Sequence, residues 1–136
     1  MLSNVSVKEY MSANVTVLTP STPVTEAIMK LITNRITSAP VMDTHGKVVG
    51  IFSELEGMKV ALEIAYNQGL AGGLVSDFMS TEINALEANT GIIELAGKLA
   101  ESDNRSYLVM DDVDVVGIIS RHDVMRAVVS IVRSTQ

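Results

Sequence analysis

The sequence predicts an α+β fold built from two tandem copies of one βαββα unit, packed sheet to sheet with pseudo-two-fold symmetry. The two halves of the 136-residue chain match each other in one register. In each half the hydrophobic period changes between strand and helix in the same order. Each half, at roughly 60 residues, would bury only a marginal core by itself. The two halves are therefore expected to pack against each other.

The internal repeat is visible as identities at a fixed offset. A shift of 68 positions places residues 7–12 over residues 75–80 and preserves Val, Met and Ser. After a one-residue deletion, residues 48–53 lie over residues 115–120 with five identities in six positions. The duplication predicts a first repeat at residues 1–68, a Gly-rich linker at 69–73 and a second repeat at 74–136.

The first repeat is predicted to contain strands at 14–18, 39–42 and 48–52, the last two buried on both faces. Between the first two strands, Thr22 and Pro23 are expected to begin a helix, with Thr as its N-cap. Its expected buried stripe contains Val24, Ala27, Ile28, Leu31 and Ile32. The closing helix is expected to bury Leu55, Met58, Leu62 and Ala65.

The second repeat is predicted to contain the same elements. Its first helix begins near 90–91 and is expected to bury Ile92, Leu95, Ala96 and Leu99. Strands follow at 107–110 and 115–119, and the acidic segment 111–114 between them is expected to be a solvated hairpin turn. This turn lacks the glycine and the terminal glutamate of an EF-hand loop. The last helix is expected to bury Val124, Val128 and Ile131.

Composition excludes several classes of function. A net charge of −6 disfavours a nucleic-acid-binding protein, because binding phosphates requires a basic face. The chain has no cysteine, and its two histidines have no companion at metal-ligand spacing, so no metal site is expected. No stretch approaches the ~20 apolar residues of a membrane helix, and the N-terminus lacks a signal-peptide pattern. We expect a cytoplasmic protein that does not enter membranes.

Segments 39–43 and 49–53, Ala-Pro-Val-Met-Asp and Val-Gly-Ile-Phe-Ser, resemble a cystathionine-β-synthase-type (CBS) repeat. The resemblance covers residues 5–60 and 73–130. Such a pair of repeats is called a Bateman module, and many of them bind adenosine nucleotides or S-adenosylmethionine in clefts between the repeats. The family's ligand signature is Gly-apolar-x-[Ser/Thr]-x-x-Asp. Residues 117–123 match it fully, whereas residues 50–56 end in Glu56.

The signature has a physical interpretation. A serine hydroxyl at a strand-to-helix junction lies beside free N–H groups, where the helix dipole favours a phosphate. A carboxylate one turn later can accept hydrogen bonds from both ribose hydroxyls, and the glycine lets a ligand approach the backbone. The alternative is a capping box, in which the two side chains only satisfy the helix N-terminus. Glu56 favours that alternative, so the first cleft is expected to be empty, weak or altered in its ligand.

The resemblance implies candidate ligand residues in each repeat. For the second repeat they are Asn84, Arg105, Ser106, Tyr107, Leu108, Gly117, Ile119, Ser120, Arg121 and Asp123. The weaker first cleft would be lined by Thr16, Ser38, Ala39, Pro40, Ser53 and Glu56. Tyr107 either stacks on a purine or packs in a core or dimer interface. Arg105 and Arg121 either bind a phosphate or are solvated surface charges.

The resemblance therefore implies a regulatory module, not an enzyme, that binds AMP, ADP, ATP or S-adenosylmethionine and acts on a partner protein. It requires no cofactor, and two modules are expected to join through their helices as a homodimer. A ligand-free dimerisation or interaction scaffold is the alternative. A regulatory piece of a larger enzyme or channel is a third possibility, which the Met1 start and the polar tail disfavour.

Overall fold

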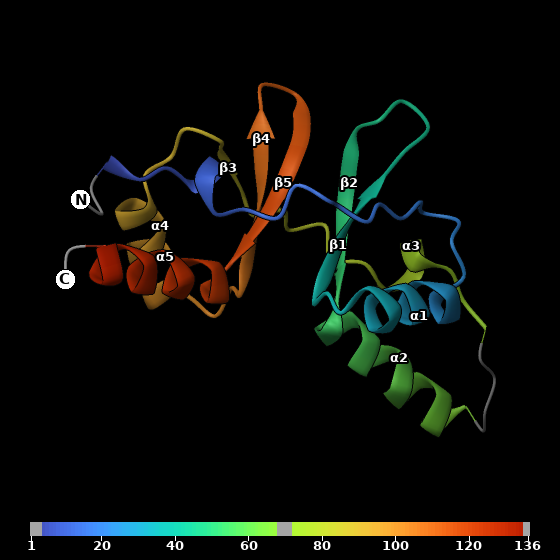
Figure 1. Ribbon diagram of the computed structural model, residues 1–136. Helices are drawn as coiled ribbons and strands as arrows, with labels where there is room; N and C mark the ends of the chain where they lie inside the picture. Colours follow the sequence, from blue (N-terminus) through green and yellow to red (C-terminus); the bar gives the residue numbers. More distant parts are fainter. Residues whose placement is uncertain (1–3, 68–71, 135–136) are drawn as a thin grey trace. The chain divides into compact units, whose positions relative to one another are not determined.

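The computed structural model of the protein describes residues 4–67 and 72–134, so most of the predicted linker at 69–73 lies outside the described residues (Figure 1). The chain forms two compact units. The first-repeat unit contains residues 16–67 and 72–83, and the second-repeat unit contains residues 4–15 and 84–134. The units do not coincide with the sequence repeats. Residues 4–15, at the start of the first repeat, belong to the second-repeat unit, and residues 74–83, at the start of the second repeat, belong to the first-repeat unit.

The first-repeat unit contains one antiparallel hairpin with helices packed against it (Figure 1). The hairpin is formed by β1 (Ser38–Met42) and β2 (Val48–Ser53). The helices are α1 (Val24–Asn34), α2 (Glu54–Tyr66) and the short α3 (Val75–Phe78). The strand predicted at 14–18 is only a single parallel bridge between Leu18 and Val41. Its backbone bonds to β1 are limited to Leu18, whose N–H donates to Pro40 and whose carbonyl accepts from Met42.

The second-repeat unit has a three-stranded sheet in the order β3-β4-β5. Strand β3 (Ala85–Glu87) is parallel to β4 (Ser106–Asp111), which is antiparallel to β5 (Asp114–Ser120). Helices α4 (Ile92–Glu101) and α5 (Arg121–Ser134) contact each other, and a 3₁₀ helix at Val7–Glu9 precedes them in the chain. The structure thus confirms the α+β class and the repeated helix–hairpin–helix order.

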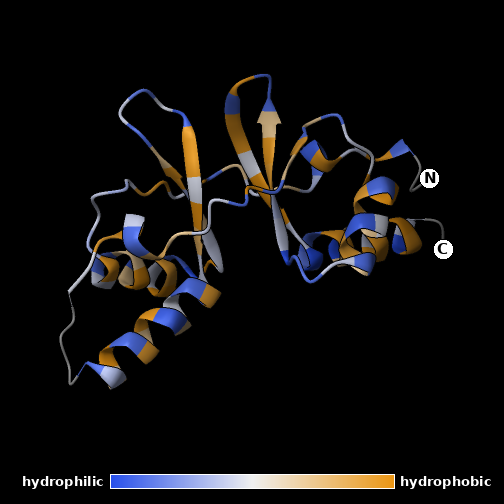
Figure 2. Ribbon diagram, turned by 180° about the vertical axis from the view of Figure 1, so that it is seen from behind, coloured by the Kyte–Doolittle hydropathy of each residue, from blue (hydrophilic) through white to orange (hydrophobic). Residues whose placement is uncertain are grey.

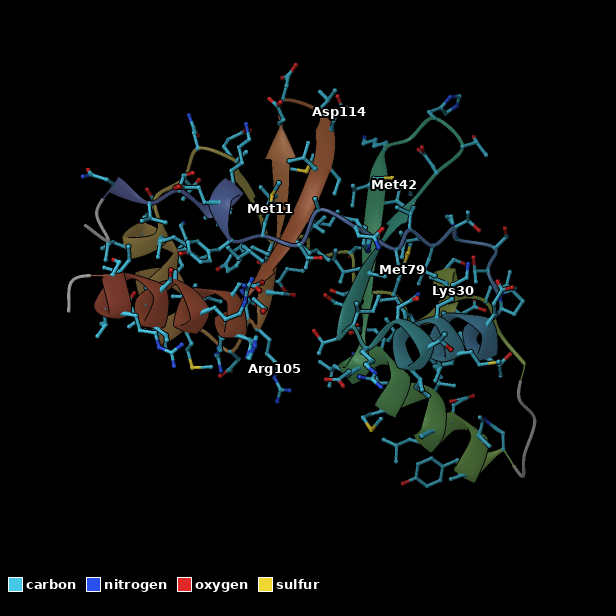
Figure 3. All side chains as sticks on the ribbon, in the orientation of Figure 1. Met11, Lys30, Met42, Met79, Arg105 and Asp114 are labelled. Carbon is cyan, nitrogen blue, oxygen red and sulfur yellow. The ribbon has the colours of Figure 1, made fainter. Side chains whose placement is uncertain are left out.

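In each unit, a Met-Ser pair from the segment that begins the other repeat is hydrogen-bonded to the last strand. Ser12 and Ile118 exchange two backbone hydrogen bonds of 2.8 and 3.0 Å, and Ile51 and Ser80 exchange the equivalent two. These pairings attach segments that are distant in the sequence to the strands that carry the ligand signature. Figure 3 labels the two methionines, Met11 and Met79, beside β5 and β2.

The signature glycines allow this pairing. A Cβ atom on Gly117 would lie 2.5 Å from the Met11 sulfur and 2.9 Å from the Ser12 carbonyl oxygen. A Cβ on Gly50 would meet Met79 and Ser80 at nearly the same distances. No side chain larger than hydrogen fits at these distances without movement of the neighbours. The close approach that the sequence assigned to a ligand is therefore made by the protein's own Met-Ser segment.

Helix α1 buries most of its predicted stripe, namely Val24, Ala27 and Leu31. Two expectations were wrong. Thr22 is not the N-cap, because Pro23 occupies that position and the Thr22 hydroxyl accepts a hydrogen bond from the Thr19 N–H. Ile32 is 71% exposed, because the buried stripe of this helix is narrower than the apolar pattern. In α4, Ile92, Leu95 and Leu99 are buried as predicted and Ala96 is half-buried.

Helix α2 turns a different face inward from the predicted one, whereas α5 largely keeps the predicted face. In α2 the large apolar residues Leu55, Met58 and Leu62 are more than half exposed and Ala65 is exposed, whereas Glu56, Gly57 and Val60 are buried. Gly57 lies against α1, where a Cβ would be in ordinary contact with Ile28 at 3.9 Å. In α5 the prediction fails only at Val128, which is exposed; Val124 and Ile131 are half-buried around the buried Ala127. Figure 2 shows the apolar residues along both helices.

We predict that Gly117→Ala lowers the free energy of unfolding by about 1–3 kcal/mol, because the new methyl group must displace Met11 or the Ser12 backbone. Gly97→Ala is the matched control. Gly97 lies in α4 with no atom within 4 Å of a Cβ, so alanine there should stabilise the helix by up to ~1 kcal/mol. Chemical denaturation of the two variants measures both values. A Gly117→Ala variant as stable as the wild type would contradict this role of the glycine.

Candidate functional site

The second-repeat signature forms the junction between β5 and α5. Ser120 is the last residue of the strand and Asp123 lies in the first turn of the helix. One carboxylate oxygen of Asp123, Oδ2, accepts hydrogen bonds from the Ser120 N–H at 2.9 Å and from its hydroxyl at 3.1 Å. These bonds satisfy a donor that would otherwise be unpaired at a helix start. Both residues of the signature therefore have a structural role.

The second oxygen of Asp123 has a different partner. Oδ1 accepts a hydrogen bond from Nη2 of Arg126, three residues later on α5, at 3.0 Å. The Asp123 side chain is only 14% exposed, whereas that of Arg126 is 52% exposed. An ionised carboxylate offers about four acceptor positions. Three are used by Ser120 and Arg126, so the capping arrangement leaves Asp123 able to accept a further hydrogen bond at Oδ1.

Strand pairing brings several predicted residues next to this junction. Ser106 is the register partner of Ser120, and the Arg105 carbonyl accepts a hydrogen bond from the N–H of Arg121. The Asn84 carbonyl accepts a hydrogen bond from Leu108, which fixes the start of β3 beside β4. Figure 3 shows Arg105 near the start of α5. Asn84, Arg105 and Ser106 thus belong to the same unit as Ser120 and Asp123.

Other predicted ligand residues have side chains occupied by the fold. Leu108 and Ile119 are buried, and Tyr107 is half-buried against the hydrophobic core around Ile119. The packing of Tyr107 agrees with the core alternative for this residue.

Arg121 is held at the end of another helix. Its Nη2 donates to the carbonyls of Leu99 and Ser102, at 3.3 and 2.8 Å. Leu99 and Ser102 lie at the C-terminus of α4, where unpaired carbonyls and the helix dipole favour a cation. Arg121 therefore stabilises the C-terminus of α4, and it remains exposed, as the surface-charge alternative expected. Phosphate binding by Arg121 stays a prediction.

The first-repeat signature is more fully enclosed. Oε1 of Glu56 accepts hydrogen bonds from the N–H and the hydroxyl of Ser53, at 2.7 and 2.5 Å, and Glu56 is only 3% exposed. The Ser53 hydroxyl also accepts a hydrogen bond from the N–H of Leu55. Ser38 is the register partner of Ser53 and is buried, as are Ala39 and Pro40. The Thr16 hydroxyl accepts a hydrogen bond from Asn34.

Arg126 and Tyr10 are the residues at this site that the sequence interpretation missed. Arg126 follows Asp123 by three positions, and an acid–base pair at this spacing on a helix is a recognisable signal. Tyr10 lies more than a hundred positions away in the sequence, so no local pattern connects it to the site.

No group of three or more potential metal-ligating side chains occurs within residues 4–67 and 72–134. In the same part of the chain, no helix is both long and apolar enough to cross a membrane.

The fold and the two signatures define a tandem-repeat α+β module with a serine–carboxylate cap at the strand-to-helix junction of each repeat. The sequence profile of the CBS domain matches residues 7–62 and again residues 75–130. Together these two matches cover most of the chain, so the protein belongs to the CBS domain family.

Relatives of the chain are stand-alone CBS-pair proteins and solved CBS pairs. The CBS domain-containing protein CBSX1, chloroplastic, from Arabidopsis thaliana is 32% identical over 87% of this chain and 61% of that protein. The chain spans about three fifths of the length of two curated relatives, CBSX1 and CBSX2, both chloroplastic by name. These names do not support a cytoplasmic location, which stays a prediction.

Solved structures agree in fold. The crystal structure of CBSX2 from Arabidopsis thaliana has a TM-score of 0.80 at 27% identity and covers 94% of this chain and 96% of that one. A structure of CBSX2 in complex with AMP has a TM-score of 0.78, at 27% identity and with 93% and 97% covered. The CBS domain pair of MJ0100, solved with 5′-methylthioadenosine and S-adenosyl-L-methionine, has a TM-score of 0.79 at 24% identity, over 93% of this chain and 97% of that chain. This last likeness supports the fold.

We predict that Glu56→Ala lowers the free energy of unfolding by about 1–3 kcal/mol, because it leaves the enclosed N–H and hydroxyl of Ser53 without their acceptor. Lys59→Ala on the exposed face of the same helix is the control and should change the unfolding free energy by less than about 0.5 kcal/mol. Urea denaturation of both variants measures the difference. Equal effects would show that the capping arrangement at Glu56 contributes nothing.

Proposed function

We propose that the protein is a regulatory module that binds an adenosine-containing ligand, such as AMP, at the junction of β5 and α5. The observation that carries the proposal is the complete signature from Gly117 to Asp123, with a carboxylate that still has an acceptor position. The AMP complex of CBSX2, a relative at 27% identity, supports the choice of ligand. We propose further that the bound state acts on a partner protein.

The ligand can use the groups that now form the helix cap. The Ser120 hydroxyl donates to Asp123 at 3.1 Å and can rotate to donate to a ligand phosphate instead. Its rotation frees a second acceptor position on Asp123, so that the carboxylate can accept from both ribose hydroxyls. The N-terminus of α5, a helix of 14 residues, favours the phosphate through its dipole. Arg105, near the start of this helix, adds positive charge.

The first-repeat signature is proposed to be a structural cap without a ligand. Glu56 is buried and bound to both donors of Ser53. Breaking the hydrogen bonds between Glu56 and Ser53 would leave the buried Glu56 carboxylate without its partners, at a cost of several kcal/mol. One ligand per chain is therefore expected.

A thermal-shift titration with AMP, ADP, ATP and S-adenosylmethionine tests the proposal and ranks the ligands. A ligand at 100 times its Kd stabilises the folded protein by about 2.7 kcal/mol, which raises Tm. Asp123→Ala should abolish the shift, and Asp114→Ala, at the exposed start of β5 directly after the β4–β5 turn, should keep it. Figure 3 labels Asp114 at that turn. No shift with any of the four compounds, or a full shift in Asp123→Ala, would contradict the proposal.

A ligand-free scaffold is the second candidate function, and the exposed apolar faces of α2 and α5 favour it. On α2 the face consists of Leu55, Met58, Leu62 and Tyr66. On α5 it consists of Met125, Val128, Val129 and Val132. Apolar surface of this extent on a soluble unit is typical of an interaction site. We propose that a second copy of the chain covers these faces, as the family resemblance implies.

We predict that the wild-type protein is a dimer by light scattering coupled to size-exclusion chromatography. Met58→Asp and Val129→Asp should each shift it to monomer, because a charge would be buried in the apolar interface. Ile93→Asp changes an equally exposed apolar residue on α4, outside both faces, and should leave the dimer intact. A monomeric wild type, or a dimer unaffected by both changes, would contradict the proposal.

A further inference from the structure

We propose that Arg126 is a positioning residue of the second-repeat ligand site, which holds the Asp123 carboxylate in the orientation that binds ribose. The inference rests on the proposed function and adds a residue outside the family signature. It follows from three contacts of one side chain and from the number of acceptor positions on Asp123.

The guanidinium of Arg126 joins Asp123 to the N-terminal segment. Its Nη2 donates to Oδ1 of Asp123 and to the backbone carbonyl of Tyr10, both at 3.0 Å. Its Cζ atom lies 5.8 Å from the centre of the Tyr10 ring, within the range of a cation–π interaction. All three residues belong to the second-repeat unit. The Tyr10 segment is itself fixed, because the N–H groups of Tyr10 and Met11 donate to Val7 in the 3₁₀ helix.

This double attachment distinguishes Arg126 from an ordinary surface ion pair. An exposed pair that holds two flexible side chains is worth at most about 1 kcal/mol. Here the arginine is anchored by a second hydrogen bond and an aromatic ring, and its acidic partner is mostly buried. The entropy cost of ordering the arginine is therefore shared among several contacts. Asp123 gains a partner with a defined position.

Arg126 fixes the orientation of the Asp123 carboxylate. Rotation about the last side-chain torsion of an aspartate is broad and roughly two-fold. Ser120 binds only Oδ2, and its hydroxyl is the bond that a ligand would redirect. With Arg126 on Oδ1, the plane of the carboxylate is fixed at both oxygens. One acceptor position remains on Oδ1, so Arg126 does not have to leave when a ribose hydroxyl binds.

The experiment compares AMP with 2′,3′-dideoxyadenosine monophosphate, which lacks both ribose hydroxyls, by calorimetric titration of the full chain. In Arg126→Gln the AMP affinity should fall about three- to tenfold. The affinity for the dideoxy nucleotide should change less than about twofold, because that ligand does not contact the carboxylate. Arg126→Lys, whose ammonium can donate to both acceptors, should restore most of the preference for AMP.

Lys59→Gln is the matched control, because Lys59 follows Glu56 by the same three positions in the first repeat. It removes the same charge from the equivalent helix and should leave both affinities unchanged. An equal loss of affinity for both nucleotides in Arg126→Gln would overturn the positioning role. It would mean that Arg126 binds the phosphate or stabilises the fold. Tighter AMP binding would overturn it too, since Arg126 would then be a competitor for Asp123. A wild type that binds neither nucleotide overturns the proposed function itself, which separates the two failures.

Discussion

The pairing of a Met-Ser segment with the last strand of each unit is the constraint on which the site depends. Ser12 is hydrogen-bonded to Ile118, and Met11 lies across Gly117. Strand β5 is thereby held between this segment and β4, and the strand delivers Ser120 to the start of α5. The same segment carries Tyr10, which binds Arg126. One backbone pairing therefore determines where the strand ends and what surrounds Asp123.

In the proposed function, the serine and the carboxylate of the second signature serve folding and binding with the same atoms. A helix that begins directly after a strand needs acceptors for its first N–H groups, and a phosphate or ribose needs the same groups. Asp123 and Glu56 cap their helices with the same pair of contacts and differ in burial. The longer side chain of Glu56 is enclosed and binds both donors of Ser53 through one oxygen. The shorter Asp123 keeps its second oxygen on the partly exposed side, bound to Arg126.

The closing helices show how a small module can present apolar surface and still fold. Helix α2 packs its small face, with Gly57 and Val60, against the unit and leaves its large apolar residues exposed. Val60 contributes to the core, while the large apolar side chains of the helix stay exposed. Those side chains remain available to cover a similar surface on another chain, where their burial contributes about 25 cal/mol per Å². In the proposed dimer, folding and association use opposite faces of this helix.

The sequence by itself determined the duplication, the hairpin in each repeat and the family, because each of these depends on local period or on identities at a fixed offset. It also offered Ser120 and Asp123 as a ligand signature or a helix cap, and the structure shows the contacts of the cap. Only the tertiary structure decided which face of α2 is buried, since both faces of that helix contain apolar residues. It also decided that Met11 lies against Gly117, that Arg121 binds the end of α4 and that Arg126 joins Asp123 to Tyr10. These contacts link residues that are distant in the chain, and their energies depend on packing, which no local pattern encodes.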